Sequence, residues 1–318
     1  MVVDWLVGIA CLVGACAAYT WCHDKLNGTD LVRDTWDQIR LAMRSIEAWD
    51  QTWRSNPLRS GIIVCLTTLP SRLPYIEPTL KSLLYQTRSP LRIRLHIPDY
   101  SIREGCRYVI PPYLTHLSGI EIVICKDHGP ATKFIPAVQD LPAGQPILVV
   151  DDDRIYPPTL VDNFQHWSEQ NPETAIGAAG WIVPHDLTDR ELNFWRNFRQ
   201  TPPAPLKSTR IHRRRRVHIL EGYAGYLIKP EFFDPTHLTD YNAAPASAFY
   251  VDDVWMSAHC RVPRVVFPAD RHVFKHWRDR PFEDTALWRV NNGGGDPEKR
   301  NNTIMIRHFA GQWEALNE

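Results

Sequence analysis

The sequence predicts a large, mostly parallel α/β domain flanked by helices and preceded by an apolar N-terminal helix and a helical stem. Three observations predict this organisation. The stretch from Trp5 to Cys22 carries no charged residue, and residues 30–53 have apolar side chains at three- and four-residue spacing, as an amphipathic helix does. From Gly61 onward, short apolar runs alternate with amphipathic segments, which is typical of strands and helices that alternate along a chain.

The composition excludes several classes of protein. Of the 318 residues, 44% are hydrophobic and 23% are charged, which suffices for a sizeable core and excludes wholesale disorder. The 36 Lys and Arg residues balance the 36 Asp and Glu residues, whereas a nucleic-acid-binding protein normally has a basic excess. The seven Cys residues include no C-x-x-C pair, so neither a zinc ribbon nor a dense disulfide framework is expected.

Residues 1–23 predict a membrane anchor or a signal. At about 1.5 Å per residue the uncharged stretch spans roughly 27 Å, which just suffices for the hydrocarbon core of a bilayer. A cleaved signal peptide is the main alternative, because Ala15-Cys16-Ala17 resembles a cleavage site, but the first four residues contain an acid and no Lys or Arg. We favour a single-pass N-terminal membrane anchor. If the chain is eukaryotic, the expected location is the Golgi or ER lumen; a bacterial membrane fits equally well.

Residues 24–56 are expected to form a helical stem. Thr29 or Asp30 can cap a helix that runs to about Trp53, and Ser55-Asn56-Pro57 ends it. We expect the apolar face of this helix to dock on the domain that follows. Its members are Val32, Trp36, Ile39, Met43, Ile46 and Trp49.

Residues 57–290 are expected to form a single domain, and residues 291–318 a surface loop and tail. Buried strands are predicted at residues 62–66, 91–97, 120–125 and 147–150. In such a sheet, ligands gather at the carboxyl ends of the strands. No Gly-x-Gly-x-x-Gly follows the first strand and no P-loop is present, so the two commonest nucleotide-binding loops are absent from the sequence.

Three adjacent acids, Asp151, Asp152 and Asp153, follow the fourth predicted strand. They repel one another, and burial would raise their pKa values. In extended backbone Asp151 and Asp153 point to one side and Asp152 to the other. A hard divalent cation, Mg²⁺ or Mn²⁺, would relieve this repulsion with few protein ligands. Capping of the next helix is the alternative, and a second acidic pair, Asp252-Asp253, favours the cation site.

Three segments, which in chain order are residues 67–87, Val149–Asp153 and Val251–Ser257, together resemble nucleotide-sugar glycosyltransferases with the GT-A fold. Val149–Asp153 looks like the Asp-x-Asp motif of that group, and residues 67–87 resemble the first strand, loop and helix of its family-two-like members. Val251–Ser257 is similar to their acid-Asp-x-x-Leu-Ser segment. A triple Asp and a paired Asp also occur in exostosin-like hexosaminyltransferases. The basic insert at residues 210–218 has no counterpart, and no Gln-x-x-Arg-Trp segment is present, so a polymer synthase is not expected.

The resemblance implies a role for individual residues. Asp153 and Asp151 would hold Mn²⁺ or Mg²⁺, with His276 as a late ligand and His272 as the second candidate for that position. Asp253 would act as general base, and Asp252 would position the base or the sugar. The residues implied to bind the nucleotide sugar are Thr67, Pro70, Arg72, Asp127, Lys133, Asp151, Asp152 and Gly222.

The implied function is metal-dependent transfer of a hexose or hexosamine from a nucleotide sugar to a hydroxyl of a carbohydrate, lipid-linked or protein-linked acceptor. Inversion is preferred because Asp253 matches the position of the base. Two alternatives stay open. One is a metal-dependent nucleotidyltransferase or phosphatase, and the other is an inactive protein of the same fold that binds sugars or a partner. No nucleic-acid partner is expected, and the run Arg213–Arg216 is most simply a solvated loop.

Overall fold

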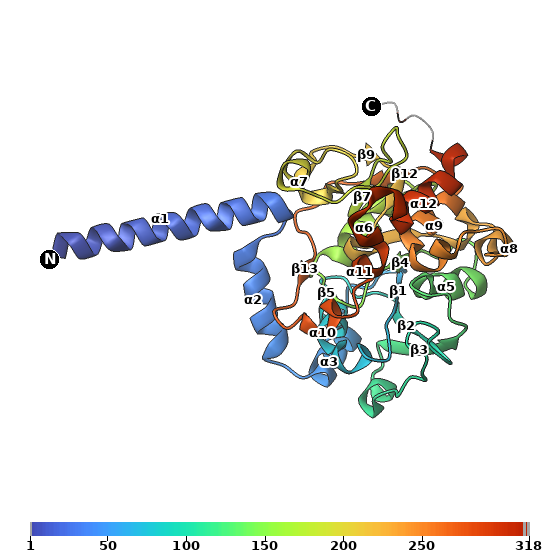
Figure 1. Ribbon diagram of the computed structural model, residues 1–318. Coiled ribbons are helices and arrows are strands. Elements are labelled where there is room, and N and C mark those ends of the chain that lie inside the picture. Colours follow the sequence, from blue (N-terminus) through green and yellow to red (C-terminus); the bar gives the residue numbers. More distant parts are fainter. Residues whose placement is uncertain (1, 314–315, 317–318) are drawn as a thin grey trace.

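The computed structural model describes residues 2–313 and 316. Helix α1 (Val2–Asn27) projects as a long rod from one side of an α/β body (Figure 1). Its residues Trp5–Asn27 form a helix long and apolar enough to cross a membrane, judged by length and composition, and the rest of the chain does not bury its apolar stretch.

The stem consists of two helices, α2 (Leu31–Ala42) and α3 (Ile46–Ser55), where the sequence predicts one. The expected cap at Asp30 is present, because its side chain accepts a hydrogen bond from the Arg33 amide. Ser45 caps α3 in the same way by accepting from the Ala48 amide. This second cap starts a new helix and therefore divides the stem.

The prediction that one apolar face docks the whole stem is wrong for α2. Ile46 and Trp49 of α3 do enter the core, but Val32, Trp36 and Met43 are exposed. Instead, α2 turns Asp34 and Asp37 toward the domain, where both carboxylates pair with the guanidinium of Arg271. The forked geometry of Arg accommodates two carboxylates at once, so the acidic face of α2 is the buried one.

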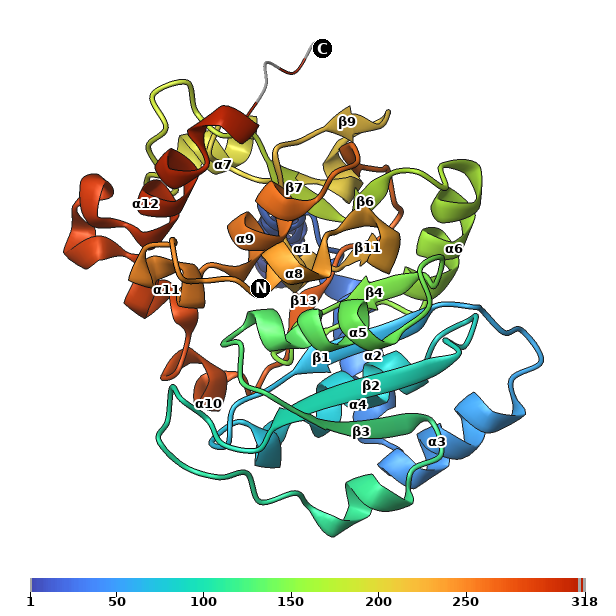
Figure 2. The ribbon, with the colours of Figure 1, turned by 90° about the vertical axis from the view of Figure 1, so that its right-hand side faces the viewer.

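An eight-stranded sheet forms the centre of the domain, in the order β3-β2-β1-β4-β11-β6-β12-β9. Figure 2 shows β3, β2, β1 and β4 side by side, continuing into β11 and β6. Six strands run in one direction, whereas β11 is antiparallel to both of its neighbours and β9 is antiparallel to β12. The predicted α/β class, a mostly parallel sheet flanked by helices and preceded by an apolar N-terminal helix, is therefore confirmed.

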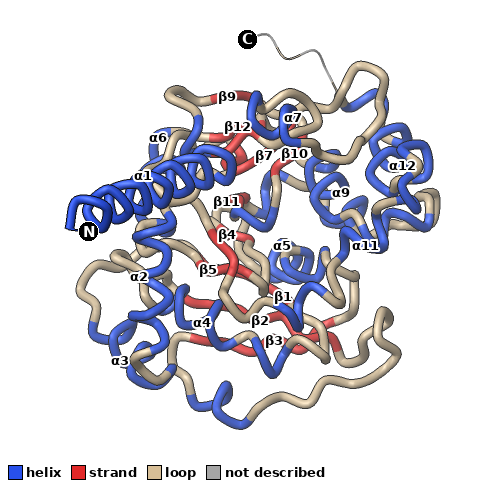
Figure 3. The backbone as a smooth tube through the Cα atoms, turned by 60° about the vertical axis from the view of Figure 1, so that its left-hand side comes forward, coloured by secondary structure: helices blue, strands red, loops and turns tan. Residues whose placement is uncertain are grey.

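The four predicted strands are all present, as β1 to β4, and helices cover both sides of the sheet. Figure 3 shows the strands between α2, α3 and α4 on one side and α5, α9 and α12 on the other. The strands of the large sheet are β1 (Ile63–Thr67), β2 (Arg92–Pro98), β3 (Ile120–Cys125), β4 (Ile147–Val149), β6 (Ala175–Gly177), β9 (Arg215–Arg216), β11 (Tyr226–Ile228) and β12 (Arg264–Val266). A small sheet contains β7 (Ala179–Trp181), β8 (Leu206–Lys207) and β10 (Ile219–Leu220), and β5 (Arg154–Ile155) pairs with β13 (Phe274–Lys275). The remaining α-helices are α4 (Glu77–Leu84), α5 (Ile135–Asp140), α6 (Leu160–Gln170), α7 (Phe194–Arg199), α8 (Pro235–Leu238), α9 (Asp252–His259), α10 (Arg280–Glu283), α11 (Leu287–Asn291) and α12 (Asn301–His308).

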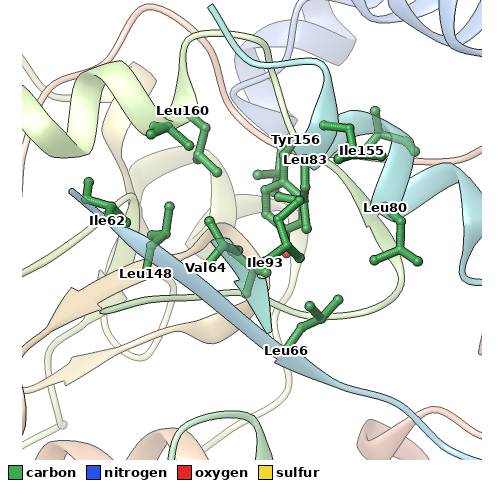
Figure 4. Close-up of a cluster of buried hydrophobic side chains, with 14 of the residues drawn as sticks. Ile62, Val64, Leu66, Leu80, Leu83, Ile93, Leu148, Ile155, Tyr156 and Leu160 are labelled. Carbon is green, nitrogen blue, oxygen red and sulfur yellow. The ribbon is translucent and has the colours of Figure 1, made fainter. Parts of the chain in front are cut away.

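Strand β1 lies between two apolar clusters. Val64 and Leu66 pack with Leu80 and Leu83 of α4 on one face of the sheet (Figure 4), whereas Cys65 belongs to the cluster on the opposite face. A strand that is buried on both faces reads as a continuous apolar run, which is why the sequence predicted it without alternation.

The last residues are part of the domain, and the prediction of a surface loop and tail from residue 291 is wrong. Helix α12 buries Met305 and Ile306 completely in the same cluster as α9. The hydroxyl of Thr303 accepts a hydrogen bond from the Asp189 amide at 2.9 Å. This short helix escaped the sequence analysis because only a few apolar residues stand among glycine-rich and polar neighbours.

Candidate functional site

A cavity of about 370 Å³ opens at the carboxyl ends of the parallel strands. Its walls come from the loops after β1, β2, β3 and β4, from the start of α9 and from α11. This is the edge of the sheet at which the sequence analysis expects a ligand. Both acidic clusters, Asp151–Asp153 and Asp252-Asp253, line this one cavity although about a hundred residues separate them along the chain.

Lys133 connects the two acidic clusters. It ends the 3₁₀ helix η3 (Ala131–Lys133), which follows β3, and it is 4% exposed. Its Nζ lies 2.7 Å from Asp151 Oδ1 and 2.7 Å from Asp252 Oδ2, and 3.7 Å from Asp253 Oδ1. Burial alone would lower the pKa of Lys133, but the three carboxylates outweigh burial and raise this pKa well above its usual value.

Asp253 is held by the glycine-rich turn before β11. Its Oδ1 accepts a hydrogen bond from the Gly222 amide at 3.0 Å. A Cβ atom at Gly222 would overlap Lys133 Nζ and lie 3.1 Å from Asp253 Oδ1, so the turn approaches the cluster as closely as only glycine permits. The enclosed position of Asp253 and the adjacent charge of Asp252 raise its pKa well above the usual value for Asp, which suits a proton acceptor.

Asp152 has different partners from its two neighbours, although the backbone at Asp152 and Asp153 forms a turn and not the extended strand on which the prediction depended. Its carboxylate accepts from Thr68 Oγ1 at 2.6 Å and from Arg72 Nη1 at 2.9 Å. Arg72 in turn donates to Thr285 Oγ1 and to the Phe282 carbonyl. Asp152 and Arg72 therefore fasten the β1 loop to the segment around α10, and burial raises the pKa of Asp152.

Asp151 and Asp153 offer oxygen ligands on the cavity side. Asp151 commits Oδ1 to Lys133, while Tyr156 fixes the strand end because its hydroxyl accepts from the Asp151 amide at 2.8 Å. Asp153 Oδ1 is buried and lies 3.4 Å from Arg154 Nε, yet it accepts no hydrogen bond from any described residue. A buried carboxylate oxygen without a hydrogen bond fits a hard divalent cation, which takes one or two carboxylates and completes its shell with water and phosphate.

The two histidines that were candidates for a third metal ligand do not line the cavity in the described part of the chain. His276 directly follows β13, and its ring Nδ1 accepts from the Arg278 amide. His272 is buried against Tyr223, and burial lowers its pKa to about 3. Among residues 2–313 and 316, no group of three or more His, Cys, Asp and Glu side chains comes together to hold a metal ion.

The other predicted nucleotide-sugar residues differ in their positions. Thr67, Arg72, Asp127 and Lys133 all line the cavity. Asp127 already accepts two backbone hydrogen bonds, from the amides of Ile102 and Gly129, each at 2.7 Å. Pro70 is not among the cavity-lining residues of the described chain, and Gly222 contributes through its backbone.

Several side chains that line the cavity were not predicted from the sequence. Glu221 is enclosed beside the acidic clusters, burial raises its pKa to about 7, and its Oε2 has no hydrogen-bond partner in the described residues. Arg103, Tyr108 and Trp288 also line the cavity. The only signal for Glu221 was its place at the head of the turn that contains Gly222 and Gly225, and nothing in the sequence marked the other three.

A second cavity, of about 1150 Å³, lies elsewhere on the domain and shares no lining residue with the first. The run Arg213–Arg216 lines it, partly through strand β9. Arg213 and Arg214 are exposed, as a solvated loop predicts, whereas Arg215 and Arg216 form β9 at the edge of the large sheet. None of these four residues lines the cavity that contains the acidic clusters.

No protein-family model matches the chain, and no curated protein matches it significantly. A search of solved structures returns S. aureus TarS 1-349, with 13% identity and a TM-score of 0.39, covering 73% of this chain and 64% of that chain. It also returns GalNAc-T7 with UDP, GalNAc and Mn²⁺, with 13% identity and a TM-score of 0.42, covering 70% of this chain and 44% of that chain. The chain thus spans less than two thirds of the length of either structure.

Proposed function

We propose that the chain is a glycosyltransferase that moves a sugar from a nucleoside-diphosphate donor to an acceptor hydroxyl. One observation carries this proposal. The acids that follow β4 and the acids that begin α9 line a single cavity, so that cation-binding and proton-accepting carboxylates share one chamber. A donor diphosphate needs the first kind of group, and an attacking hydroxyl needs the second.

Asp151 and Asp153 would hold Mn²⁺ or Mg²⁺. When bound, the cation would stabilise the diphosphate that leaves as the sugar–oxygen bond breaks. Asp152 and Arg72 would contribute by fixing the β1 loop, and Thr67 and Asp127 stand where the nucleotide would bind. His276 could join the metal only after its side chain turned into the cavity.

Asp253 would accept the proton from the acceptor hydroxyl. Its raised pKa favours proton uptake, and the Gly222 amide fixes its orientation. Asp252, which is more deeply buried, would keep Lys133 in place. A base in this position on an incoming hydroxyl suits inversion at the anomeric carbon. A hexose and a hexosamine fit this chemistry equally. We propose that α1 anchors the enzyme in a membrane, which in a eukaryotic cell would put the enzyme at the Golgi or ER lumen.

The ion pairs of Lys133 favour a second candidate function. One buried ammonium already supplies positive charge to Asp151 and Asp252, so these two carboxylates are paired without a metal ion. A protein that binds sugars without reacting with them would need no more than this. Such a protein would gain no stability from a nucleoside diphosphate with Mn²⁺, whereas a donor-binding enzyme would.

The full chain in detergent micelles can decide between these functions. We would measure nucleoside diphosphate release from a panel of nucleotide sugars, and thermal unfolding with UDP and Mn²⁺, before and after chelation. We expect D151N/D153N to lose both the stabilisation and the release. D253N should keep the stabilisation and lose the release. Asp162→Asn, an exposed acid in α6, is the matched control and should behave as the parent. Full release by D151N/D153N in the presence of a chelator would refute the proposal.

A further inference from the structure

Helix α2 presents an apolar stripe to the outside of the molecule. The exposed fractions are 70% for Val32, 57% for Trp36, 38% for Ile39 and 78% for Met43. These side chains are spaced three to four residues apart and therefore share one face of the helix. An exposed stripe of this size on a helix normally marks a contact with a partner or a membrane.

The opposite, polar face fixes α2 in this orientation. Asp37 Oδ2 lies 2.5 Å from Arg271 Nη1, and Asp34 pairs with the other nitrogen of the same guanidinium. Gln38 Oε1 accepts a hydrogen bond from the Trp277 amide at 2.8 Å. Turning the apolar stripe inward would break these buried ion pairs, and so the stripe stays outside.

A second exposed apolar group lies on α7. Phe194, Trp195 and Phe198 are 56%, 61% and 43% exposed, and their rings contact one another. Hydrogen bonds fasten the region of α7 to the C-terminal end of α1. Asn197 Nδ2 donates to the Leu26 carbonyl at 3.3 Å, and Thr209 Oγ1 donates to the Gly28 carbonyl at 2.7 Å.

The placement of these two elements relative to α1 points to their environment. Figure 1 shows α2 running across the axis of α1, on the side of the domain from which α1 projects, with α7 beside the base of α1. Tyr19 and Trp21 are exposed near the same end of α1. If α1 spans a bilayer, all three groups of aromatic side chains lie at the level of the headgroups, where Trp and Tyr are enriched.

The charges around the stripe agree with this environment. Arg33 and Arg40 flank the apolar face of α2, and Arg196 and Arg199 flank the aromatic face of α7. A helix with an apolar face and flanking basic residues lies in the plane of an interface and is attracted to anionic lipids.

We propose that α2 and α7 rest in the interface of the bilayer that α1 enters, and so hold the domain against the membrane in one orientation. The membrane-facing set is Val32, Trp36, Ile39, Met43, Phe194, Trp195 and Phe198. This inference depends on α1 being in the bilayer, and it does not depend on glycosyl transfer.

The test uses the full chain in nanodiscs of phosphatidylcholine with a minority of phosphatidylserine, both carrying photoactivatable acyl chains. After illumination, mass spectrometry identifies the labelled peptides. We expect label on α1, on residues 31–43 and on residues 192–199, several-fold above the peptides with the exposed residues Val109 and Tyr100. Trp36→Ser with Met43→Ser should reduce label on α2 alone, and Trp195→Ser with Phe198→Ser on α7 alone. Val109→Ser with Tyr100→Ser should change neither.

Two results would overturn the proposal. One is labelling of α2 and α7 no stronger than that of the Val109 and Tyr100 peptides, with or without label on α1. The other is a dimer of the chain in nanodiscs that Trp36→Ser with Met43→Ser, or Trp195→Ser with Phe198→Ser, converts to a monomer, which would make the stripe a dimer contact. None of these measurements requires turnover. The membrane contact can therefore be confirmed in a chain without transferase activity, and it can be refuted in a chain that has this activity.

Discussion

Replacement of Lys133 by Met tests whether one buried ammonium holds the acidic clusters together. The substitution keeps the length of the side chain and removes its charge. It leaves three carboxylates, those of Asp151, Asp252 and Asp253, without the cation that lies between 2.7 and 3.7 Å from each. Removing one partner of a buried ion pair costs about 3–5 kcal/mol.

Thermal unfolding of the full chain in detergent measures this cost. In a large domain, each kcal/mol lost from the free energy of unfolding lowers the midpoint of thermal unfolding by roughly 2–4 °C. We therefore expect Lys133→Met to lower this midpoint by about 6–20 °C. The deficit should shrink at mildly acidic pH, because the uncompensated carboxylates can then take up protons. Lys299→Met is the control, since the ion pair of Lys299 is solvent-exposed and such pairs contribute only about 0–1 kcal/mol. A midpoint equal to that of the control at neutral pH would refute the assignment of Lys133 as the central cation.

Two further predictions concern the surroundings of the cluster. Gly222→Ala should displace the ammonium of Lys133 and lower both the unfolding midpoint and any turnover, whereas Gly144→Ala, where an added Cβ meets nothing within 4 Å, should leave both unchanged. His272 should make the protein sensitive to acid, because burial lowers its pKa to about 3 from an unfolded value of 6.5. As the pH falls below 6.5, the unfolded chain binds a proton that the folded chain excludes, so the free energy of unfolding falls by about 1.4 kcal/mol per pH unit. Urea unfolding of the parent and of His272→Leu, at neutral and mildly acidic pH, measures this effect. The free energy of unfolding should fall less steeply with pH in the variant, by the slope that corresponds to one proton; an identical slope in both proteins would contradict the prediction.

Much of the fold was predictable because its strands are buried on both faces. The apolar runs that became β1 to β4 could be read directly, and the triple Asp after β4 marked the edge at which the cavity opens. The orientation of α2 was not predictable. Periodicity shows that Val32, Trp36 and Met43 share a face, but it does not show that Arg271, more than two hundred residues later, pairs with the opposite face.

The site was predictable in its residue types and only partly in its contacts. Asp252 and Lys133 were both candidates, but their ion pair depends on the tertiary placement of η3 beside α9. Arg72 was expected to bind the nucleotide, yet its guanidinium donates hydrogen bonds to Asp152 and to the segment around α10. A single arginine in a loop gives no indication of which of these it does.

The reversed direction of β11 has a consequence for how such a domain can change over time. Because this strand runs against its neighbours, the turn that carries Glu221 and Gly222 lies at the sheet edge where the cavity opens, immediately before the chain enters β11. The excursion from β7 to β10 ends just before that turn and can be lengthened, shortened or exchanged while the paired strand keeps the turn in register. We expect related domains to differ most in this excursion, while the cavity with the two acidic clusters stays the same.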